Sequence, residues 1–206
     1  MTLKIIQDFI PTTLPTRPGT SLKPTFITIH NTDNTSKGAG AAAHNRYVRG
    51  DDAVRRKVSW HFTADDKEIY QHLPMNEVGW HSNREGNSKS IGIEICMNSD
   101  MDVSTGYKNA AALVAHCVKA LGLKFPGCMV QHADWSGKNC PSVIRAGSVI
   151  SWSQFLDMCD QQASSKAADG AALTEQEAPE WTDENSEQIL RSIDQAIGLH
   201  HGGEDE

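Results

Sequence analysis

The sequence predicts one α/β domain over residues 1–162, followed by an acidic tail over residues 163–206. Short segments rich in β-branched and aromatic residues alternate with longer segments whose apolar residues recur at helical spacing. Strands interleaved with helices are typical of α/β domains. The length of 206 residues suits one domain of ordinary size with some chain left over.

Five segments have the composition and length of β-strands. They are residues 26–30, 58–64, 68–73, 90–97 and 128–132. In the first of them, the alternation of a strand puts Ile27 and Ile29 on one face and Thr28 and His30 on the other. His30 therefore ends this strand on its polar side.

Three segments predict helices. Residues 39–49 have a helix-forming composition, and residues 106–122 carry an apolar stripe at helical spacing. The third helix covers residues 151–162, with Ser151 as its N-cap. Its apolar face consists of Trp152, Phe155, Leu156 and Cys159.

The tail differs from the rest of the chain in charge and in pattern. Residues 163–206 contain 2 basic and 11 acidic residues, whereas residues 1–162 contain 17 and 15. Most of the tail lacks the apolar periodicity that a core needs, so it is interpreted as a linker. Apolar residues near 183–199 do repeat at helical spacing, which predicts a short helix. That helix would dock on the body, join a second chain in an oligomer, or fray in solution.

Composition excludes several classes of protein. No apolar run approaches the roughly 18 residues of a membrane span, and the nearly neutral body lacks the basic stripe of nucleic-acid-binding proteins. The basic run at residues 55–57 is interpreted as a solvated loop. Residues 1–19 include Asp8 and several prolines, which do not fit a secretory signal peptide. Five cysteines without a CxxC pair indicate mostly reduced thiols.

Two histidines and a cysteine predict a metal centre. The segment QHADWSGKNCP puts His132 at the end of a second strand and Cys140 eight residues further along a loop that contains glycine. Together with His30 they offer two imidazoles and a thiolate, which is a donor set that zinc prefers. Three protein ligands leave one position open, so we expect one catalytic Zn²⁺ ion.

The alternative is a closed structural site in which Cys128 supplies a fourth ligand. Cys128 lies near the start of its strand, roughly 13 Å from His132 at the rise of a strand, which disfavours this arrangement. The remaining cysteines fit better as small buried apolar residues. They are Cys96, Cys117 and Cys159.

A carboxylate in the middle of a predicted strand indicates a catalytic role. In IGIEIC the isoleucines form a core face, while Gly92 and Glu94 point the other way. Gly92 would leave space for a substrate and a water molecule. The alternative is that Glu94 lies on a solvated face or pairs with an arginine. With a metal nearby, Glu94 is instead expected to act as a proton shuttle. Lys138, two residues before Cys140, would stabilise an oxyanion because of this position, and an ordinary surface lysine is the alternative.

These residues resemble a known family. The chain is similar to the zinc N-acetylmuramoyl-L-alanine amidases of the type 2 amidase and peptidoglycan recognition protein group, and looks closest to endolysins of phages that infect Gram-positive bacteria. The matching segments lie in the family's order within about residues 24–145. They are ITIHNTDN, SWHFTADDKEIYQH, GWHS, SIGIEICMN and QHADWSGKNCP.

The resemblance implies the type 2 amidase/peptidoglycan-recognition fold, a mixed central β-sheet flanked by helices. It implies one zinc ion, and cleavage of the amide bond between the N-acetylmuramic acid lactyl group and L-alanine. Glu94 matches the family's catalytic carboxylate and Lys138 its transition-state lysine.

Other aromatic residues and histidines are assigned less directly. Trp60 takes the place of a catalytic tyrosine found in some branches, and is interpreted as either a groove wall or a core residue. His61 and His81 are expected to line or brace the site. Three further histidines have no motif support, and we expect them on the surface. They are His44, His72 and His116.

The resemblance also implies phage-type cell-wall lysis. Such an enzyme would stay in the host cytoplasm until holin pores release it, and would then act on peptidoglycan; no nucleic-acid or membrane partner is expected. Endolysins of this kind usually add a cell-wall-binding module, which the tail does not resemble. Two rivals remain, namely a recognition protein of the same fold that binds without cleaving, and an enzyme that recycles soluble wall fragments. The complete metal and acid/base set favours cleavage over binding, and Cys140 disfavours the recycling enzymes, whose third ligand is usually a carboxylate.

Overall fold

The computed structural model describes residues 4–169 and 174–177. The helix expected near 183–199 lies outside these residues. One seven-stranded sheet runs through the described part in the order β6-β2-β5-β3-β4-β1-β7. The strands are β1 (Lys4–Gln7), β2 (Phe26–Asn31), β3 (Phe62–Ala64), β4 (Ile69–Gln71), β5 (Ser90–Ile95), β6 (Met129–Gln131) and β7 (Thr174–Glu177). The helices are α1 (Ala41–Tyr47), α2 (Asp51–Arg56), α3 (Arg84–Lys89), α4 (Val103–Leu121), α5 (His132–Ser136), α6 (Ser142–Ala146) and α7 (Trp152–Asp169).

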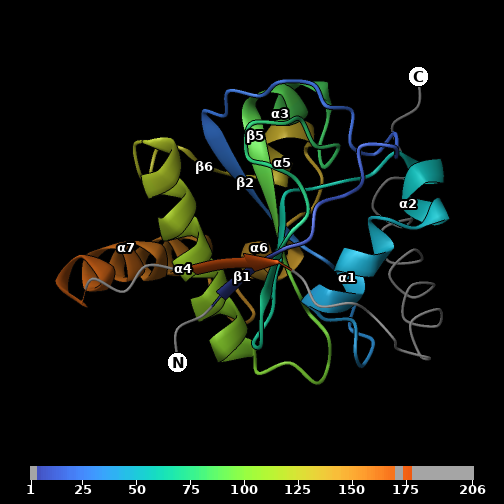
Figure 1. Cartoon of the computed structure of the whole chain (residues 1–206). Coiled ribbons are helices and arrows are strands. Elements are labelled where there is room, and N and C mark those ends of the chain that lie inside the picture. The colour runs from blue at the N-terminus through green and yellow to red at the C-terminus, as the bar shows by residue number, and fades with distance from the viewer. Residues whose placement is uncertain (1–3, 170–173, 178–206) are drawn as a thin grey trace.

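The sheet is mixed and lies between helices. Every paired strand runs parallel to its neighbour except β3 and β4, which are antiparallel. In Figure 1, α4 and α7 lie on one side of the sheet, and α1 and α2 lie on the other. The expected α/β architecture, a mixed central sheet flanked by helices, is confirmed.

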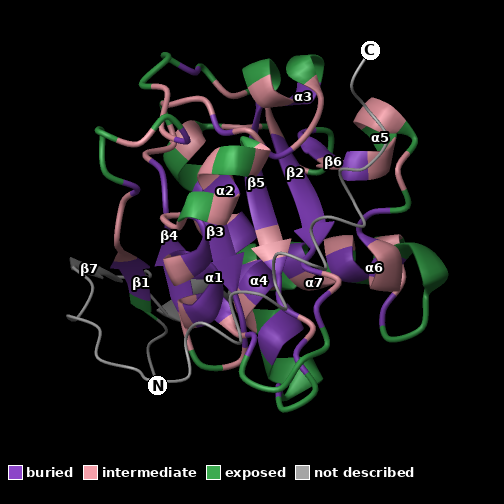
Figure 2. Ribbon diagram, turned by 90° about the vertical axis from the view of Figure 1, so that its right-hand side faces the viewer, coloured by how far each residue is buried: buried purple, intermediate pink, exposed green. Residues whose placement is uncertain are grey.

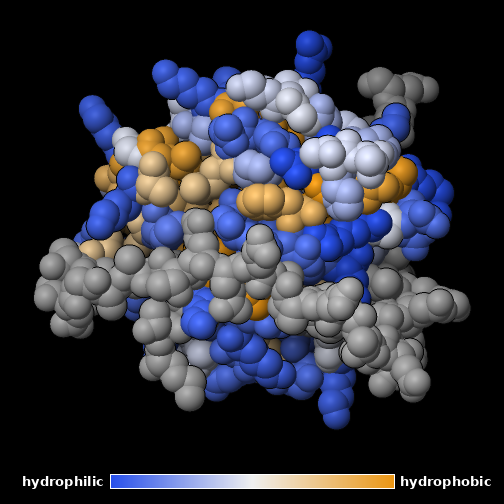
Figure 3. All heavy atoms as spheres, viewed as in Figure 1, coloured by the Kyte–Doolittle hydropathy of each residue, from blue (hydrophilic) through white to orange (hydrophobic). Residues whose placement is uncertain are grey.

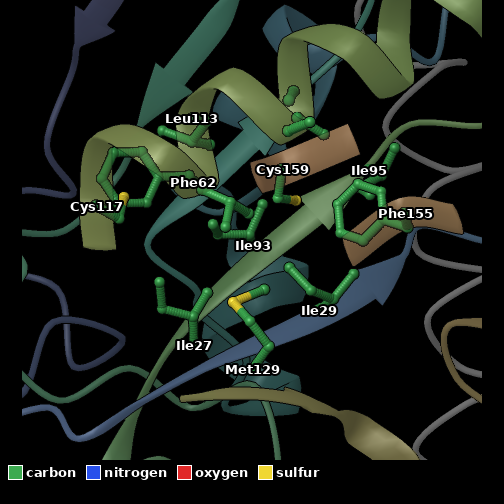
Figure 4. Packing of buried hydrophobic residues seen from close by; sticks show 14 of the residues in the cluster. Ile27, Ile29, Phe62, Ile93, Ile95, Leu113, Cys117, Met129, Phe155 and Cys159 are labelled. Atoms are coloured by element: carbon green, nitrogen blue, oxygen red, sulfur yellow. The ribbon is translucent and has the colours of Figure 1, made fainter. Parts of the chain in front are cut away.

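The main core forms where β2 and β5 face α4 and α7. Ile27 and Ile29 of β2 and Ile93 of β5 are fully buried there, and they pack in one cluster with Leu113 of α4 and Phe155 of α7 (Figure 4). The alternation of a strand turns Thr28, His30 and Glu94 to the opposite face. The central strands are therefore covered on both faces, and Figure 2 shows them as almost wholly buried.

Register brings the two chemically important strand residues side by side. β2 and β5 pair in parallel, with His30 directly opposite Glu94. Both residues lie toward the carboxyl ends of their strands, which is where ligands bind in open parallel sheets. The sheet thus positions a histidine and a glutamate as neighbours on its polar face.

Several elements differ from the sequence-based expectations. The predicted strand 58–64 is regular only from Phe62, because the Ser59 amide donates to the Trp80 carbonyl of a loop instead of to a strand. The basic run at 55–57 ends α2 rather than lying in a loop. The predicted helix 151–162 continues to Asp169, so the boundary placed at residue 162 falls within α7.

Two strands were not predicted. Ile5 and Ile6 of β1 are both buried, because this strand is covered on both faces and so lacks the alternation of polar and apolar residues. β7 has the sequence TEQE, with no apolar residue, and pairs with β1 through its backbone. This strand lies in the segment that was interpreted as a linker.

The surface expectation is wrong for His44 and His72, whose side chains are buried. His72 Nδ1 lies 3.0 Å from Asn45 Oδ1, and its Nε2 lies 2.8 Å from the Thr63 hydroxyl. A neutral imidazole with both ring nitrogens hydrogen-bonded can be buried at little cost. His116 on α4 is half-buried.

The described surface mixes residue types. On the face in Figure 3, hydrophobic residues form separate patches among hydrophilic ones. Within the described residues, no helix has the length and apolar character needed to cross a bilayer.

Candidate metal centre

His30, His132 and Cys140 lie together, as the sequence predicts. All three side chains are buried, and one ligand atom from each lies within 4.8 Å of the others. Cys140 Sγ is 3.7 Å from His30 Nδ1. Zinc–nitrogen and zinc–sulfur bonds of about 2.0 and 2.3 Å at a tetrahedral angle put the nitrogen and the sulfur about 3.5 Å apart. The residues therefore fit one tetrahedrally bound ion.

The chain segments that carry these ligands are fixed by hydrogen bonds. His132 begins α5, whose first turn is capped where Asp134 accepts from the Gln131 amide at 2.7 Å. The Cys140 carbonyl accepts from the Ala133 amide at 2.9 Å, which holds the loop back against the helix. Gly137 ends α5 with a φ of 78°, a left-handed conformation that glycine adopts without strain.

A neighbouring histidine fixes the tautomer of His30. His81 Nε2 lies 3.2 Å from the Ser90 carbonyl, which can only accept, so His81 carries its proton on Nε2. Burial lowers the pKa of His81 well below the ordinary value, so the ring is neutral and its Nδ1 is an acceptor. His30 Nε2, at 3.1 Å, must then donate to His81 Nδ1. The lone pair of His30 Nδ1 is left facing Cys140, as a metal ligand requires.

The space beside Gly92 is used differently from what the sequence analysis expected. A Cβ atom at Gly92 would lie 2.6 Å from Cγ of His81, because the His81 ring fills that space. The ring takes the place that was assigned to substrate and water. Gly92 is required so that His81 can reach His30.

His61 braces the same strand. Its Nδ1 accepts from the Gly92 amide at 3.0 Å, and its Nε2 donates to the Glu77 carbonyl at 2.8 Å. The side chain is buried and does not line the pocket described below. Its place in the structure is that of a support for β5.

The Glu94 carboxylate lies next to the three candidate ligands, and its side chain is 15% exposed. Its Oε1 lies 3.9 Å from His30 Nδ1, and its Oε2 is buried without a hydrogen-bond partner. Burial raises the pKa of Glu94 to about 8, with a further increase from Asp33 and a decrease from Lys138. Burial also raises the pKa of Cys140 well above that of an ordinary thiol. A cation between these groups would favour their ionised forms.

A pocket opens over this group of residues. The space within it, including the part that is open to solvent, is about 440 Å³. The walls include the three candidate ligands and Glu94, together with Asn31, Thr32, His44, Val58, Trp60, Trp80, His81 and Lys138. Lys138 is half-buried. The acid/base candidate and the lysine thus share one cavity with the metal ligands.

Trp60 is both a pocket wall and a core residue. Its side chain is buried, stacks on Tyr47 with ring centroids 6.3 Å apart, and donates from Nε1 to the Thr63 hydroxyl at 2.7 Å. With its indole N–H bonded to Thr63, Trp60 offers the pocket an apolar ring surface.

Sequence reasoning missed His44, which lines the pocket. Its signal was helical periodicity, because Ala41, His44 and Val48 are three and then four residues apart and all are buried. Cys128, by contrast, is buried in the main core with Ile27 and does not belong to the ligand group.

Buried neutral histidines should make the folded state less stable in acid. Burial lowers the pKa values of His44 and His61 from 6.5 to about 4. Above pH 6.5 both are neutral whether folded or unfolded. Below it the unfolded chain binds protons that the folded chain does not, so the free energy of unfolding falls by about 1.4 kcal/mol per pH unit for each histidine.

We expect the urea concentration at the unfolding midpoint of chelator-treated protein to decrease as the pH is lowered from about 6.5 to about 4. Equilibrium unfolding followed by tryptophan fluorescence measures it. A midpoint that is constant over this range would contradict neutral burial of these histidines.

The chain is similar to known cell-wall amidases. The family model described as N-acetylmuramoyl-L-alanine amidase matches residues 20–143. The Bacillus subtilis protein N-acetylmuramoyl-L-alanine amidase XlyA is 46% identical over 156 residues, which are 74% of this chain and 50% of that protein. CwlH of the same organism is 43% identical over 157 residues, 74% of this chain and 60% of that protein. The chain thus spans about half the length of these curated relatives.

Solved structures show the same similarity. The catalytic domain of XlyA superposes with a TM-score of 0.70 at 43% identity, over 76% of this chain and 99% of that one. A mutant endolysin from Bacillus subtilis gives a TM-score of 0.70 at 45% identity, over 76% and 99% of the two chains. The PlyG catalytic domain gives a TM-score of 0.67 at 26% identity, over 78% of this chain and 96% of that one.

Proposed function

Since this chain belongs to the N-acetylmuramoyl-L-alanine amidase family, we propose that it hydrolyses the amide bond between the lactyl group of N-acetylmuramic acid and L-alanine in peptidoglycan. The single observation that carries this proposal is the grouping of His30, His132 and Cys140 beside Glu94. A closed structural site would need a fourth protein ligand, whereas this group opens into a pocket.

The residues have separate tasks in the proposed reaction. His30, His132 and Cys140 would hold a zinc ion, which would supply a Lewis acid for water and for the scissile carbonyl. Glu94 takes a proton from the attacking water through its unpartnered Oε2 and returns it to the leaving nitrogen. The new carbon–oxygen bond forms first and gives a tetrahedral intermediate, and the carbon–nitrogen bond breaks when the leaving nitrogen takes the proton from Glu94. Lys138 donates to the oxyanion of the tetrahedral intermediate.

His81 has a positioning role in this proposal. The His81→Phe variant keeps a ring against Gly92 but cannot accept from His30 Nε2. Loss of such a supporting hydrogen bond costs about 10- to 100-fold in metal affinity. Competition with a chromogenic chelator measures the zinc dissociation constant, and His116→Phe on α4 is the matched control. Equal zinc affinity in both variants would contradict the role of His81.

Mass spectrometry of digested peptidoglycan tests the bond that is cut. We expect free L-alanyl amino termini without new reducing sugar ends. New reducing ends, or no products, would overturn the proposal, and tight binding without products would favour a recognition protein. Digestion of intact sacculi rather than soluble fragments would separate wall lysis from recycling.

The biological setting is proposed from the relatives. Similarity to an endolysin supports phage-type lysis, in which the protein reaches the cell wall through holin pores. Residues 1–162 would be the catalytic domain, and the acidic tail outside β7 would be a linker or an assembly element. Neither nucleic acid nor membrane is proposed as a partner.

A further inference from the structure

Three polar side-chain atoms in the pocket lack hydrogen-bond partners. Among the described residues, Thr32 Oγ1, His44 Nε2 and Glu94 Oε2 are buried without a partner, and all three residues line the same cavity. A buried acceptor without a donor is costly, and such groups usually mark a place where a ligand completes the bonding. Glu94 is already assigned to proton transfer; His44 has no role in the reaction as proposed.

The hydrogen bond on its other nitrogen makes His44 Nε2 an acceptor. His44 Nδ1 lies 2.9 Å from the Gly40 carbonyl one turn earlier in the chain, so Nδ1 carries the proton. Burial lowers the pKa of His44 to about 4, which keeps the ring neutral. The side chain is 1% exposed. Its Nε2 lone pair therefore needs a donor from a molecule in the pocket.

His44 lies on the opposite side of Glu94 from the metal ligands. In the sheet, β2 and β6 lie on one side of β5, and β3 lies on the other. His30 belongs to β2 and His132 follows β6, whereas α1, which carries His44, packs on β3 and β4. His44 Nδ1 is 3.9 Å from Sγ of Cys96, the residue that directly follows β5 and lies two residues after Glu94. The pocket thus passes from the metal ligands across Glu94 to His44.

This order determines which part of the substrate meets His44. The scissile carbonyl belongs at the metal ligands, and the leaving nitrogen belongs at Glu94, which protonates it. The chain that continues beyond Glu94 is the peptide stem, not the glycan. Its first hydrogen-bond donor after the leaving nitrogen is the amide N–H that follows L-alanine.

We propose that His44 Nε2 accepts a hydrogen bond from the amide N–H that follows L-alanine, so that the enzyme selects stems of at least two residues. This inference rests on the proposed function and adds a specificity residue to the same site. Val58, Trp60 and Trp80 line the pocket with His44 and offer apolar surface to the stem.

A pair of substrates that differ in one group tests the proposal. The probes are N-acetylmuramoyl-L-alanyl-D-isoglutamine and its depsipeptide analogue, in which an ester oxygen replaces the N–H after alanine. Wild-type enzyme should prefer the amide by about 10- to 100-fold in kcat/KM, because the ester leaves His44 without a donor. In His44→Phe this preference should fall to about twofold or less, through loss of activity on the amide alone.

Two further variants keep the test decisive. His44→Gln places an amide oxygen near the position of Nε2 and should restore part of the preference, while His116→Phe should keep the wild-type preference. Zinc content and melting temperature are measured for each protein. Equal losses on both substrates in His44→Phe and His44→Gln would overturn the inference and leave the proposed function standing. A wild-type enzyme that cleaves neither probe nor sacculi would overturn both.

Discussion

Replacing Cys140 with serine is expected to remove the metal and with it all measurable turnover. A serine hydroxyl is a poor ligand for zinc beside the thiolate that it replaces, so only the two imidazoles of His30 and His132 remain. Two ligands from distant parts of the chain hold an ion far more weakly than three. We expect less than about one tenth of the wild-type zinc content after dialysis, and no release of L-alanyl amino termini.

Cys128→Ser is the matched control. Cys128 is also a buried thiol, but it packs in the main core, away from the ligand group. Its serine variant should lose stability, because a hydroxyl replaces sulfur in apolar surroundings, and should keep its zinc. Elemental analysis by plasma mass spectrometry gives both zinc contents. Loss of zinc from Cys128→Ser as well as from Cys140→Ser would favour the structural-site alternative.

The Glu94→Gln variant should bind zinc and substrate but turn over about 10²- to 10⁴-fold more slowly. Glutamine has nearly the shape of glutamate, so the pocket beside His30 should be preserved. Its amide cannot take a proton from water, and the unpartnered Oε2 of Glu94 is the atom to which that task is assigned. The loss should therefore fall on kcat and leave the zinc content unchanged.

Glu68→Gln separates this effect from the general cost of losing a partly buried carboxylate. Burial also raises the pKa of Glu68, to about 7, yet Glu68 does not line the pocket. Its variant should digest purified cell walls at the wild-type rate. Digestion by Glu94→Gln at that same rate would show that another group transfers the proton.

The sequence predicts the central strands and the metal ligands correctly, because there the periodicity of apolar residues and the chemistry of the polar side chains agree. The alternation in FITIH and IGIEIC predicts correctly which residues of β2 and β5 enter the core and which face the site. The spacing in QHADWSGKNCP brings His132 and Cys140 close to His30, although residues 132–136 form a short helix and not a loop. The preference of zinc for imidazole and thiolate ligands predicts that these distant residues lie together, which a local sequence pattern cannot predict.

Sequence patterns do not predict the features that depend on contacts between distant parts of the chain. The space at Gly92 was assigned to a substrate, but His81 comes from a loop whose path no local pattern specifies. The absence of motif support predicts surface positions for His44 and His72, whereas hydrogen bonds to Gly40, Asn45 and Thr63 let both be buried. β1 is not predicted because burial on both faces removes the alternation of polar and apolar residues.

The separation of the ligands along the chain has a consequence for folding. His30 and Cys140 are 110 residues apart, so an ion bound to both would act as a reversible cross-link that closes a loop of more than half the chain. Closing a loop of that length restricts the unfolded chain by up to about 5 kcal/mol when the link is a covalent disulfide. The supply of zinc would then govern the stability of the folded protein as well as its catalytic activity.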